Sequence, residues 1–324
     1  MASLKNIKLK IQSYKKTGTV THAMEAVSAV KMRKAQERAL GGRAYAAAAL
    51  SVLERLSGTI DIGHHPLMQA IIPTETTLHH TSKLGGVTSE FPKTCFVVIT
   101  SDKGLAGSLN SAVIRRTETE IASRGLTSEQ IIMIAIGRRG ADYFASRGYD
   151  VHMRHENISD DVSEVDIREI TDSLITWHGA KQIGSCVVIY TNFVSTFEQE
   201  AVARQIIPIT PEMLRETVAG IRPARGRYAP LPSEIAQKPA TYTIEPDADS
   251  ILAELLPRLL NIAIFHALLE SKASEHSARR VAMKSATDKA KDMTKSYTRI
   301  FNKARQAAIT AEVSEITSGM EAMR

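Results

Sequence analysis

The chain has 324 residues, of which 43% are hydrophobic and 23% charged, and this is ordinary globular chemistry. No apolar run reaches the roughly 18 residues that a membrane span needs, so we expect a soluble or peripheral protein. Cys95 and Cys186 each lie inside an apolar run, which argues against a disulfide framework and for a reducing compartment.

The net charge of +6 is unevenly distributed along the chain. Residues 1–43 carry a net charge of +8 and residues 272–305 carry +7, so the remainder totals −9. Two basic end segments around an acidic middle favour an acidic or polyanionic partner for the ends.

The N-terminal segment has an apolar stripe with helical spacing. The stripe runs through Leu4, Ile7, Ile11 and Tyr14, and after Gly18 it resumes at Val20, Met24 and Val27. This pattern predicts a long amphipathic helix. It ends at Gly41-Gly42 or continues to about Leu56, so we assign residues 1–57 to it. Residues 58–93 are rich in Gly, Pro, His and Thr and are expected to form an irregular connection.

The central segment shows strand-like periodicity. Short apolar runs occupy 95–100, 131–136 and 186–190, and helical patterns at 107–123, 139–146 and 163–178 alternate with them; 198–209 is a candidate edge strand. Strands alternating with helices predict a parallel sheet with helices on its faces. Residues 94–210 are therefore expected to form a Rossmann-like α/β domain.

The C-terminal part begins with a proline-rich stretch. We expect an extended loop and a short strand over 211–246, followed by a helix over 247–324 that Asp247 or Asp249 caps. Its heptad stripe comprises Met283, Ala286, Ala290, Met293, Tyr297, Ile300, Ala304, Ala307 and Ala311. Matching stripes at both ends predict a long antiparallel coiled coil, in which small alanines let the two helices approach closely.

Few residues suggest chemistry of their own. The turn "SDKGLAGSLN" lacks a phosphate-binding glycine signature, so we interpret it as a tight strand-to-helix turn. The pairs His64-His65 and His79-His80 leave a structural zinc site open, although no further ligand lies at a supporting spacing. The acidic stretch Asp160, Asp161, Glu164 and Asp166 fits either helix capping or a docking patch for a basic partner. His22, His266 and His276 are interpreted as surface or seam residues. We expect no catalytic, cofactor-binding or metal-binding residue.

Five stretches resemble one known family. They are "MASLKNIKLKIQSYKKTGTVTHAMEAVSAVKMRKAQ" (1–36), "SDKGLAGSLN" (101–110), "EPD" (245–247), "ASEHSARRVAMKSATDKAKDM" (273–293) and "NKARQAAITAEVSEITSG" (302–319). All are similar to the γ subunits of F-type ATP synthases. The resemblance covers both ends and the central domain, and with Met1 present and no convincing transit peptide it points to a bacterial member.

The resemblance implies a non-catalytic rotary subunit. In this family the two terminal helices form a shaft inside a hexamer of three α and three β subunits. The central domain contacts the ε subunit and the membrane rotor c ring, and the whole complex also contains δ, a and b subunits. Proton flow turns the rotor, and catalysis belongs to β. The resemblance therefore implies a peripheral protein on the cytoplasmic face of the bacterial inner membrane, without a cofactor.

The resemblance also assigns partner contacts. Arg305 and Gln306 match a pair that hydrogen-bonds a loop of β, Met24 matches a methionine near the β contact, Arg279 matches an arginine involved in coupling, and Lys31, Arg33 and Lys34 match a basic run that faces the collar of the hexamer. Without the resemblance, each charged residue reads as a solvated side chain on a helix. Two other functions stay open on the residues alone: a nucleic-acid-binding coiled coil and a nucleotide-dependent α/β enzyme.

Overall fold

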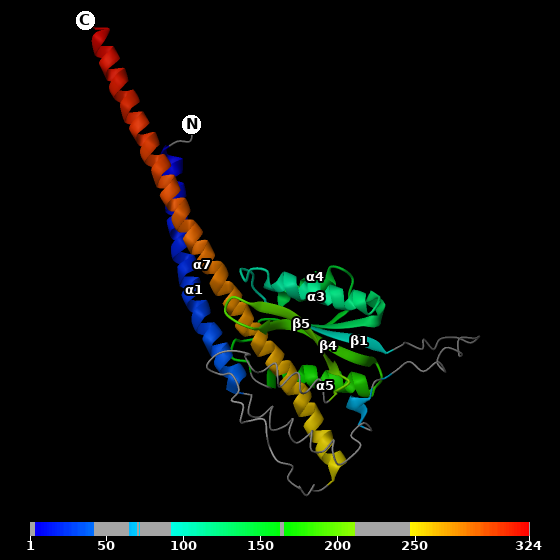
Figure 1. The fold of residues 1–324 in the computed structure, drawn as a ribbon. Coiled ribbons are helices and arrows are strands. Elements are labelled where there is room, and N and C mark those ends of the chain that lie inside the picture. Colours follow the sequence, from blue (N-terminus) through cyan, green and yellow to red (C-terminus); the bar gives the residue numbers. More distant parts are fainter. Residues whose placement is uncertain are drawn as a thin grey trace, which may run out of the picture. The chain divides into compact units, whose positions relative to one another are not determined.

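The computed structural model describes residues 4–41, 65–69, 71, 92–162, 165–210 and 247–323. The chain divides into two compact units, the first formed by Met1–Val30 and Arg279–Arg324 and the second by Lys31–Ala278. Two long helices, α1 (Leu4–Gly41) and α7 (Ala248–Glu321), each contribute to both units (Figure 1). The expected continuation of α1 toward Leu56 and the strand expected within 211–246 lie outside the described residues.

In the first unit α1 and α7 form an antiparallel pair. The rings of Tyr14 and Tyr297 stack with their centroids 5.4 Å apart. One turn further along α1, a Cβ added to Gly18 would lie 3.5 Å from the Cβ of Ala290. The contact partners rise in number along α1 while they fall along α7, so the predicted antiparallel pairing is confirmed (Figure 1).

The α1 seam differs from the predicted stripe. Val20 and Val27 were expected in it, but they are 58% and 55% exposed. Instead the spacing of three and four residues continues without a break from Leu4, and Gly18, Thr21 and Ser28 occupy the seam. Apolar side chains did not mark the seam positions here, because two helices that approach closely need small side chains between them. A buried hydroxyl is tolerated at such a position when it has a hydrogen-bond partner within the seam.

That hydroxyl pairing is visible between the two helices. The Oγ1 atoms of Thr21 and Thr287 lie 2.7 Å apart, and the Thr287 hydroxyl donates to the carbonyl oxygen of Met283 at 2.8 Å. The Thr21 hydroxyl likewise lies 3.2 Å from the Gly18 carbonyl oxygen, so either hydroxyl can donate across the seam. Because both threonines are buried, this pair satisfies two polar groups that would otherwise destabilise the contact.

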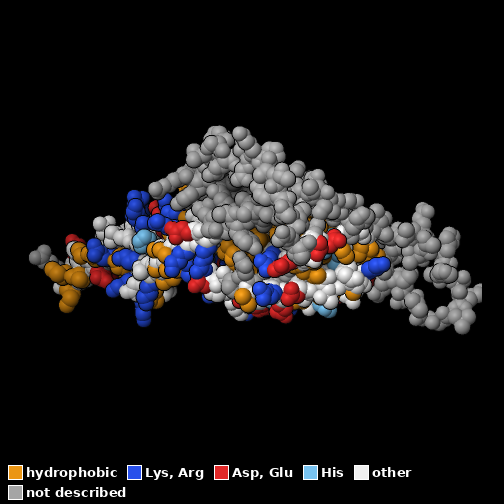
Figure 2. All heavy atoms as spheres, turned by 90° about the horizontal axis from the view of Figure 1, so that it is seen from below, with side chains coloured by type: hydrophobic (Ala, Val, Ile, Leu, Met, Phe, Trp, Pro, Cys, Tyr) orange, Lys and Arg blue, Asp and Glu red, His pale blue; other side chains and the backbone are white. Residues whose placement is uncertain are grey.

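The α7 seam is shifted in part from its predicted positions. Met283, Ala286, Ala290, Met293, Tyr297 and Ala304 are buried or half-buried as expected, but Ile300, Ala307 and Ala311 are exposed. Thr287, Thr294, Phe301 and Ala308, which the predicted stripe did not include, are also buried or half-buried. The Gly18–Ala290 register places Leu4 opposite Ala304, so the exposed residues 309–321 of α7 extend past Leu4. Figure 2 shows hydrophobic side chains uncovered at this end.

The second unit contains a five-stranded sheet in the order β3-β2-β1-β4-β5. Its strands are β1 (Lys93–Ile99), β2 (Ile131–Ile136), β3 (Val151–His155), β4 (Ile183–Phe193) and β5 (Gln199–Ile207). The first four are parallel, and β5 is antiparallel to β4. The predicted strands and the edge strand are confirmed, but β3 was missed because "VHMRH" is short, polar and only half-buried.

Helices cover both faces of this sheet (Figure 1). One face carries α3 (Leu109–Ser123) and α4 (Arg138–Ala145), and the other carries α5 (Val165–Gly179) and the first part of α7. Short 3-10 turns, η2 (Pro66–Met68) and η4 (Ser128–Gln130), complete the described elements. The predicted α/β layering is therefore confirmed.

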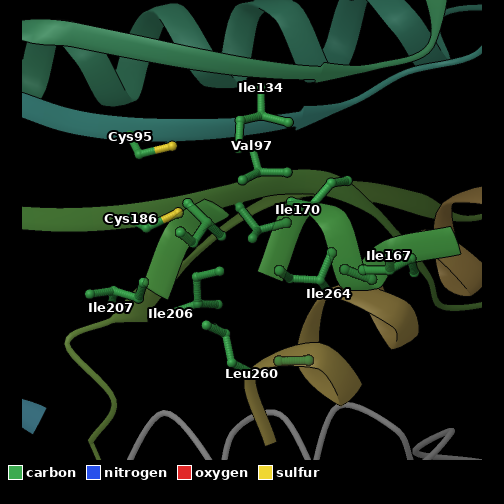
Figure 3. Close-up of a cluster of buried hydrophobic side chains, with 14 of the residues drawn as sticks. Cys95, Val97, Ile134, Ile167, Ile170, Cys186, Ile206, Ile207, Leu260 and Ile264 are labelled. Carbon is green, nitrogen blue, oxygen red and sulfur yellow. The ribbon is translucent and has the colours of Figure 1, made fainter. Parts of the chain in front are cut away.

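The larger core lies between the sheet, α5 and α7. Figure 3 shows Cys95 and Cys186 on neighbouring strands, with Leu260 and Ile264 of α7 across the cluster. By length and composition alone α7 could cross a membrane, but its apolar residues Leu252, Leu256, Leu260, Ile264 and Leu268 are buried in this core. Asp247 caps the helix, accepting the Ser250 N–H at 2.8 Å, as predicted.

Candidate partner interface

The helical pair of the first unit presents a basic surface. Residues 4–30 and 279–323 contain 14 Lys and Arg residues against 6 Asp and Glu residues. Figure 2 shows Lys and Arg side chains gathered with hydrophobic ones between them. Lys10 also lies over the Tyr297 ring, with its Nζ 5.4 Å from the centroid. Such a surface attracts anionic partners through its summed field.

Four of the predicted contact residues lie in the first unit. Arg305 and Gln306 are exposed on α7, level with the start of α1, and both point away from the seam. Met24 is half-buried beside the seam, where its carbonyl oxygen accepts the Ser28 hydroxyl at 2.7 Å. Arg279 is half-buried at the point where α7 enters this unit. Arg305 and Gln306 are therefore open to solvent, whereas Met24 and Arg279 are partly covered.

The other three predicted residues lie in the second unit and behave differently from one another. The Arg33 side chain is 80% exposed and pairs with Glu37 one turn later at 2.9 Å, and Lys34 is exposed. Lys31 instead reaches the chain's own acidic loop, with its Nζ 2.6 Å from Asp160 Oδ2. Only Arg33 and Lys34 of this run present their charge outward.

The acidic loop, residues 158–161, joins both long helices within the second unit. Asp160 Oδ1 lies 2.9 Å from His276 Nε2 of α7, while Oδ2 meets Lys31 of α1. Arg38 donates to the Asp160 carbonyl oxygen at 3.0 Å and pairs with the Asp161 carboxylate. His276 first, and then Lys31, hold the pKa of the Asp160 carboxyl well below its usual range.

This arrangement bears on the two interpretations of the acidic stretch. Asp160 and Asp161 do bind basic groups, but those groups belong to the chain's own helices. Asp166 lies in the first turn of α5, where a carboxylate is favoured by the helix dipole. Glu164 lies outside the described residues.

The turn after β1 is built from internal contacts. The Ser101 N–H donates to Asn110 Oδ1 at 2.9 Å. Asp102 accepts two backbone N–H groups, that of Arg138 at the start of α4 and that of Asn157, each at 3.0 Å. Asp102 therefore occupies the N-terminus of α4, while Asn110 in the first turn of α3 ties that helix back to Ser101. These contacts fit the interpretation of a tight structural turn.

Two histidine predictions need correction. His266 and His276 were expected at a surface or seam, but they are 5% and 4% exposed within the second unit. Their spacing on α7 continues that of the buried leucines, and this periodicity was the signal available in the sequence. Of the histidines considered for zinc, His65 uses Nδ1 to accept the Leu67 N–H at 3.2 Å, while His64, His79 and His80 lie outside the described residues.

The comparisons with known proteins agree with this architecture. The ATP synthase family model matches residues 3–323. The ATP synthase gamma chain of Pelotomaculum thermopropionicum is 35% identical over 324 residues, and that of Heliobacterium modesticaldum is 34% identical over 323 residues; both alignments cover 100% of each chain. The chain belongs to the ATP synthase γ-chain family.

Solved structures share the fold of this chain. A chain of the Euglena gracilis mitochondrial ATP synthase, from its OSCP/F1/c-ring structure, matches with a TM-score of 0.61 at 14% identity, covering 99% of this chain and 94% of its own length. A chain of the Tetrahymena thermophila mitochondrial ATP synthase central stalk and c-ring matches with a TM-score of 0.54 at 22% identity, covering 82% and 99%. The predicted combination of a sheet domain with two long terminal helices is therefore confirmed.

Proposed function

We propose that the chain is the non-catalytic rotary central-stalk subunit of a proton-translocating ATP synthase. Its membership of the γ-chain family over residues 3–323 carries this proposal. In it, the helical pair turns inside a hexamer of three α and three β subunits and changes the nucleotide affinity of each catalytic site in turn. The chain itself makes and breaks no bond.

The geometry of the helical pair supports a role as a shaft. Close approach at Gly18 and Ala290 keeps the pair slim. Beyond Leu4, α7 carries an exposed apolar series at a spacing of four and three, comprising Ile309, Val313, Ile316 and Met320, and the exposed Met323 follows just after the helix. Apolar side chains in such a series are expected to lie against a partner surface, because a large exposed apolar patch marks an interaction site. A ring of subunits around the shaft provides that surface.

Polar contacts with β are assigned to the basic residues that face outward. Arg305 and Gln306 would hydrogen-bond a loop of β, since a guanidinium suits charge-assisted pairing with a carboxylate. Met24 and Arg279 would contact β further down the shaft, and Arg33 and Lys34 would face the collar of the hexamer. Lys31 belongs to the same run, but in the free chain it holds Asp160, so its role for β is secondary.

The second unit is proposed to connect the shaft to the remaining rotor. It would contact the ε subunit and the c ring, in a complex that also contains δ, a and b subunits. The chain would then lie peripherally on the cytoplasmic face of a bacterial inner membrane, attached only through the complex. The roles of the long segments 58–93 and 211–240 are not assigned.

The first experiment removes the two outward polar groups. Arg305→Ala combined with Gln306→Ala should lower the rate of ATP synthesis by membranes carrying the complex about tenfold. The variant loses a charge-assisted hydrogen bond from Arg305 and a neutral hydrogen bond from Gln306. Asn302→Ala with Lys303→Ala is the matched control, since these exposed residues lie one turn earlier. Wild-type synthesis by the Arg305/Gln306 variant in a fully assembled complex would refute the assigned contact.

The assignment of the whole subunit is tested by native mass. Gentle purification of the tagged chain should yield a complex many times 35.4 kDa that contains three copies each of two larger subunits and hydrolyses ATP. Recovery of a monomer without ATPase activity, or of a complex with nucleic acid whose affinity falls steeply with salt, would overturn the proposal.

A further inference from the structure

A buried glutamate lies where α7 crosses the sheet of the second unit. Glu270 is 6% exposed, and it faces Tyr190 of β4, which is 1% exposed. Neither residue takes part in the partner contacts or in the acidic loop described above. A carboxyl group in such a position is costly to bury and calls for a physical explanation.

The surroundings of Glu270 do not fully compensate a charge. Its Oε2 and the hydroxyl oxygen of Tyr190 are both buried, and neither has a hydrogen-bond partner among the described residues. On its own helix, His266 Nδ1 lies 3.6 Å from Glu270 Oε1, beyond good hydrogen-bond distance. Arg204 of β5 lies over the Tyr190 ring, with its Cζ 5.5 Å from the ring centroid.

Three groups with polar or charged side chains act on Glu270: His266 from α7, Tyr190 from β4 and Arg204 from β5. Among these groups Arg204 is the permanent cation that would oppose the charge of an ionised Glu270, and it also lies over the Tyr190 ring. Either form of Glu270 can share one hydrogen bond with the Tyr190 hydroxyl, the carboxylate as acceptor and the neutral acid as donor, but only the neutral acid avoids placing a charge in the core.

We propose that Glu270, together with Tyr190, forms a buried proton-binding site that couples protonation of the carboxyl group to the packing of α7 against β4 and β5. One proton passes between solvent and Glu270 Oε2, and no other bond changes. With the proton bound, α7 packs tightly on the sheet. Without it, an uncompensated charge lies in the core, and this part of α7 opens more often.

The pH range of the effect follows from the direction of the shift. Burial raises the pKa of Glu270 to about 7, although Arg204 and Tyr190 act in the opposite direction. For an acid with a raised pKa, the contribution to stability is complete below the unfolded value of about 4.5 and is lost as the pH rises through the folded value. The site therefore responds around neutral pH, whereas ordinary glutamates stay ionised there.

The first measurement uses the full-length wild-type chain. Infrared spectra in D₂O should show the C=O stretch of a protonated carboxylic acid at about pH 6, and this band should disappear by about pH 8.5. Glu270→Gln should remove the band at every pH. Glu254→Gln is the matched control, because Glu254 lies on the same helix with a side chain that is 71% exposed, and it should leave the band unchanged.

The second measurement follows packing. Protection factors for the α7 amides around Glu270, from hydrogen exchange corrected for the intrinsic rate, should fall about tenfold between about pH 6 and about pH 8.5 in the wild type. They should stay constant in Glu270→Gln. An absent acid band at pH 6, or the same tenfold fall in Glu270→Gln, would overturn the proposal. Neither measurement needs the assembled complex, so their outcome is independent of the proposed rotary function.

Discussion

A disulfide across the helical seam gives a direct test of the register. The Cβ that Gly18 lacks would lie 3.5 Å from the Cβ of Ala290, at the short end of the roughly 3.5–4.5 Å range that disulfides span. Gly18→Cys combined with Ala290→Cys should therefore form a crosslink on mild oxidation. The native Cys95 and Cys186 are 0% exposed, so they should not compete.

The expected stabilisation follows from the loop that the crosslink closes. Positions 18 and 290 enclose about 270 residues, for which the chain-entropy relation gives an upper limit of about 5.6 kcal/mol. Strain at a short Cβ separation lowers this figure, so we expect about 2–4 kcal/mol. The gain should appear as a higher urea midpoint for loss of helical circular dichroism, and it should disappear when a reductant is added.

The matched control places the α1 cysteine at position 20, which the apolar stripe of the sequence predicted to lie in the seam. Val20→Cys with Ala290→Cys should crosslink slowly or not at all, because Val20 is 58% exposed on the outer side of α1. If this control links as readily as the Gly18 pair, the seam derived from the structure is wrong. In the assembled complex, the Gly18–Ala290 crosslink should leave ATP hydrolysis intact, because it joins two helices of one rotating body.

Three further substitutions test the second unit through the fluorescence of Trp177, the one tryptophan in the sequence. Gly137→Ala should lower the free energy of unfolding by about 3 kcal/mol, because the residue has φ 98° and a Cβ would lie 2.1 Å from the Thr100 carbonyl oxygen. The control Gly148→Ala, with φ 80° and open space around it, should lower it by only about 1 kcal/mol. Equal losses in the two variants would contradict the argument. Asp160→Asn should cost about 1 kcal/mol at neutral pH after allowance for solvent screening. Because the pKa of Asp160 is lowered in the fold, this difference should shrink as the pH falls below about 4, and a difference that grows in acid would refute the assigned ion pairs.

The sequence was most informative where periodicity and composition agree. The runs at 95–100, 131–136 and 186–190 are apolar on both faces, and each became a buried strand of the sheet. The edge strand β3 has one exposed face and carries arginine and histidine, so its composition resembles that of a loop. Edge strands are the elements for which apolarity is the weakest guide.

The candidate interface could be predicted only in part, for a related reason. Arg305, Gln306, Arg33 and Lys34 are exposed, as residues that contact a partner must be. The sequence could not reveal that Lys31 turns to Asp160, because the two are far apart in the chain and the pairing depends on the folded loop. Long-range ion pairs of this kind are a property of the tertiary structure, whereas the exposure of a helical face is a property of local spacing.

The unbroken alternation of three and four residues along α1 also restricts how the chain can change in length. A single inserted residue rotates every following side chain by about 100° about the helix axis, which would turn Gly18 and Thr21 away from Ala290 and Thr287. An insertion of seven residues nearly restores the face and lengthens the helix by about 10 Å. Insertions and deletions in this segment should therefore survive selection in multiples of seven, matched by an equal change in α7, while the exposed loops of the same protein are free to vary by one residue at a time.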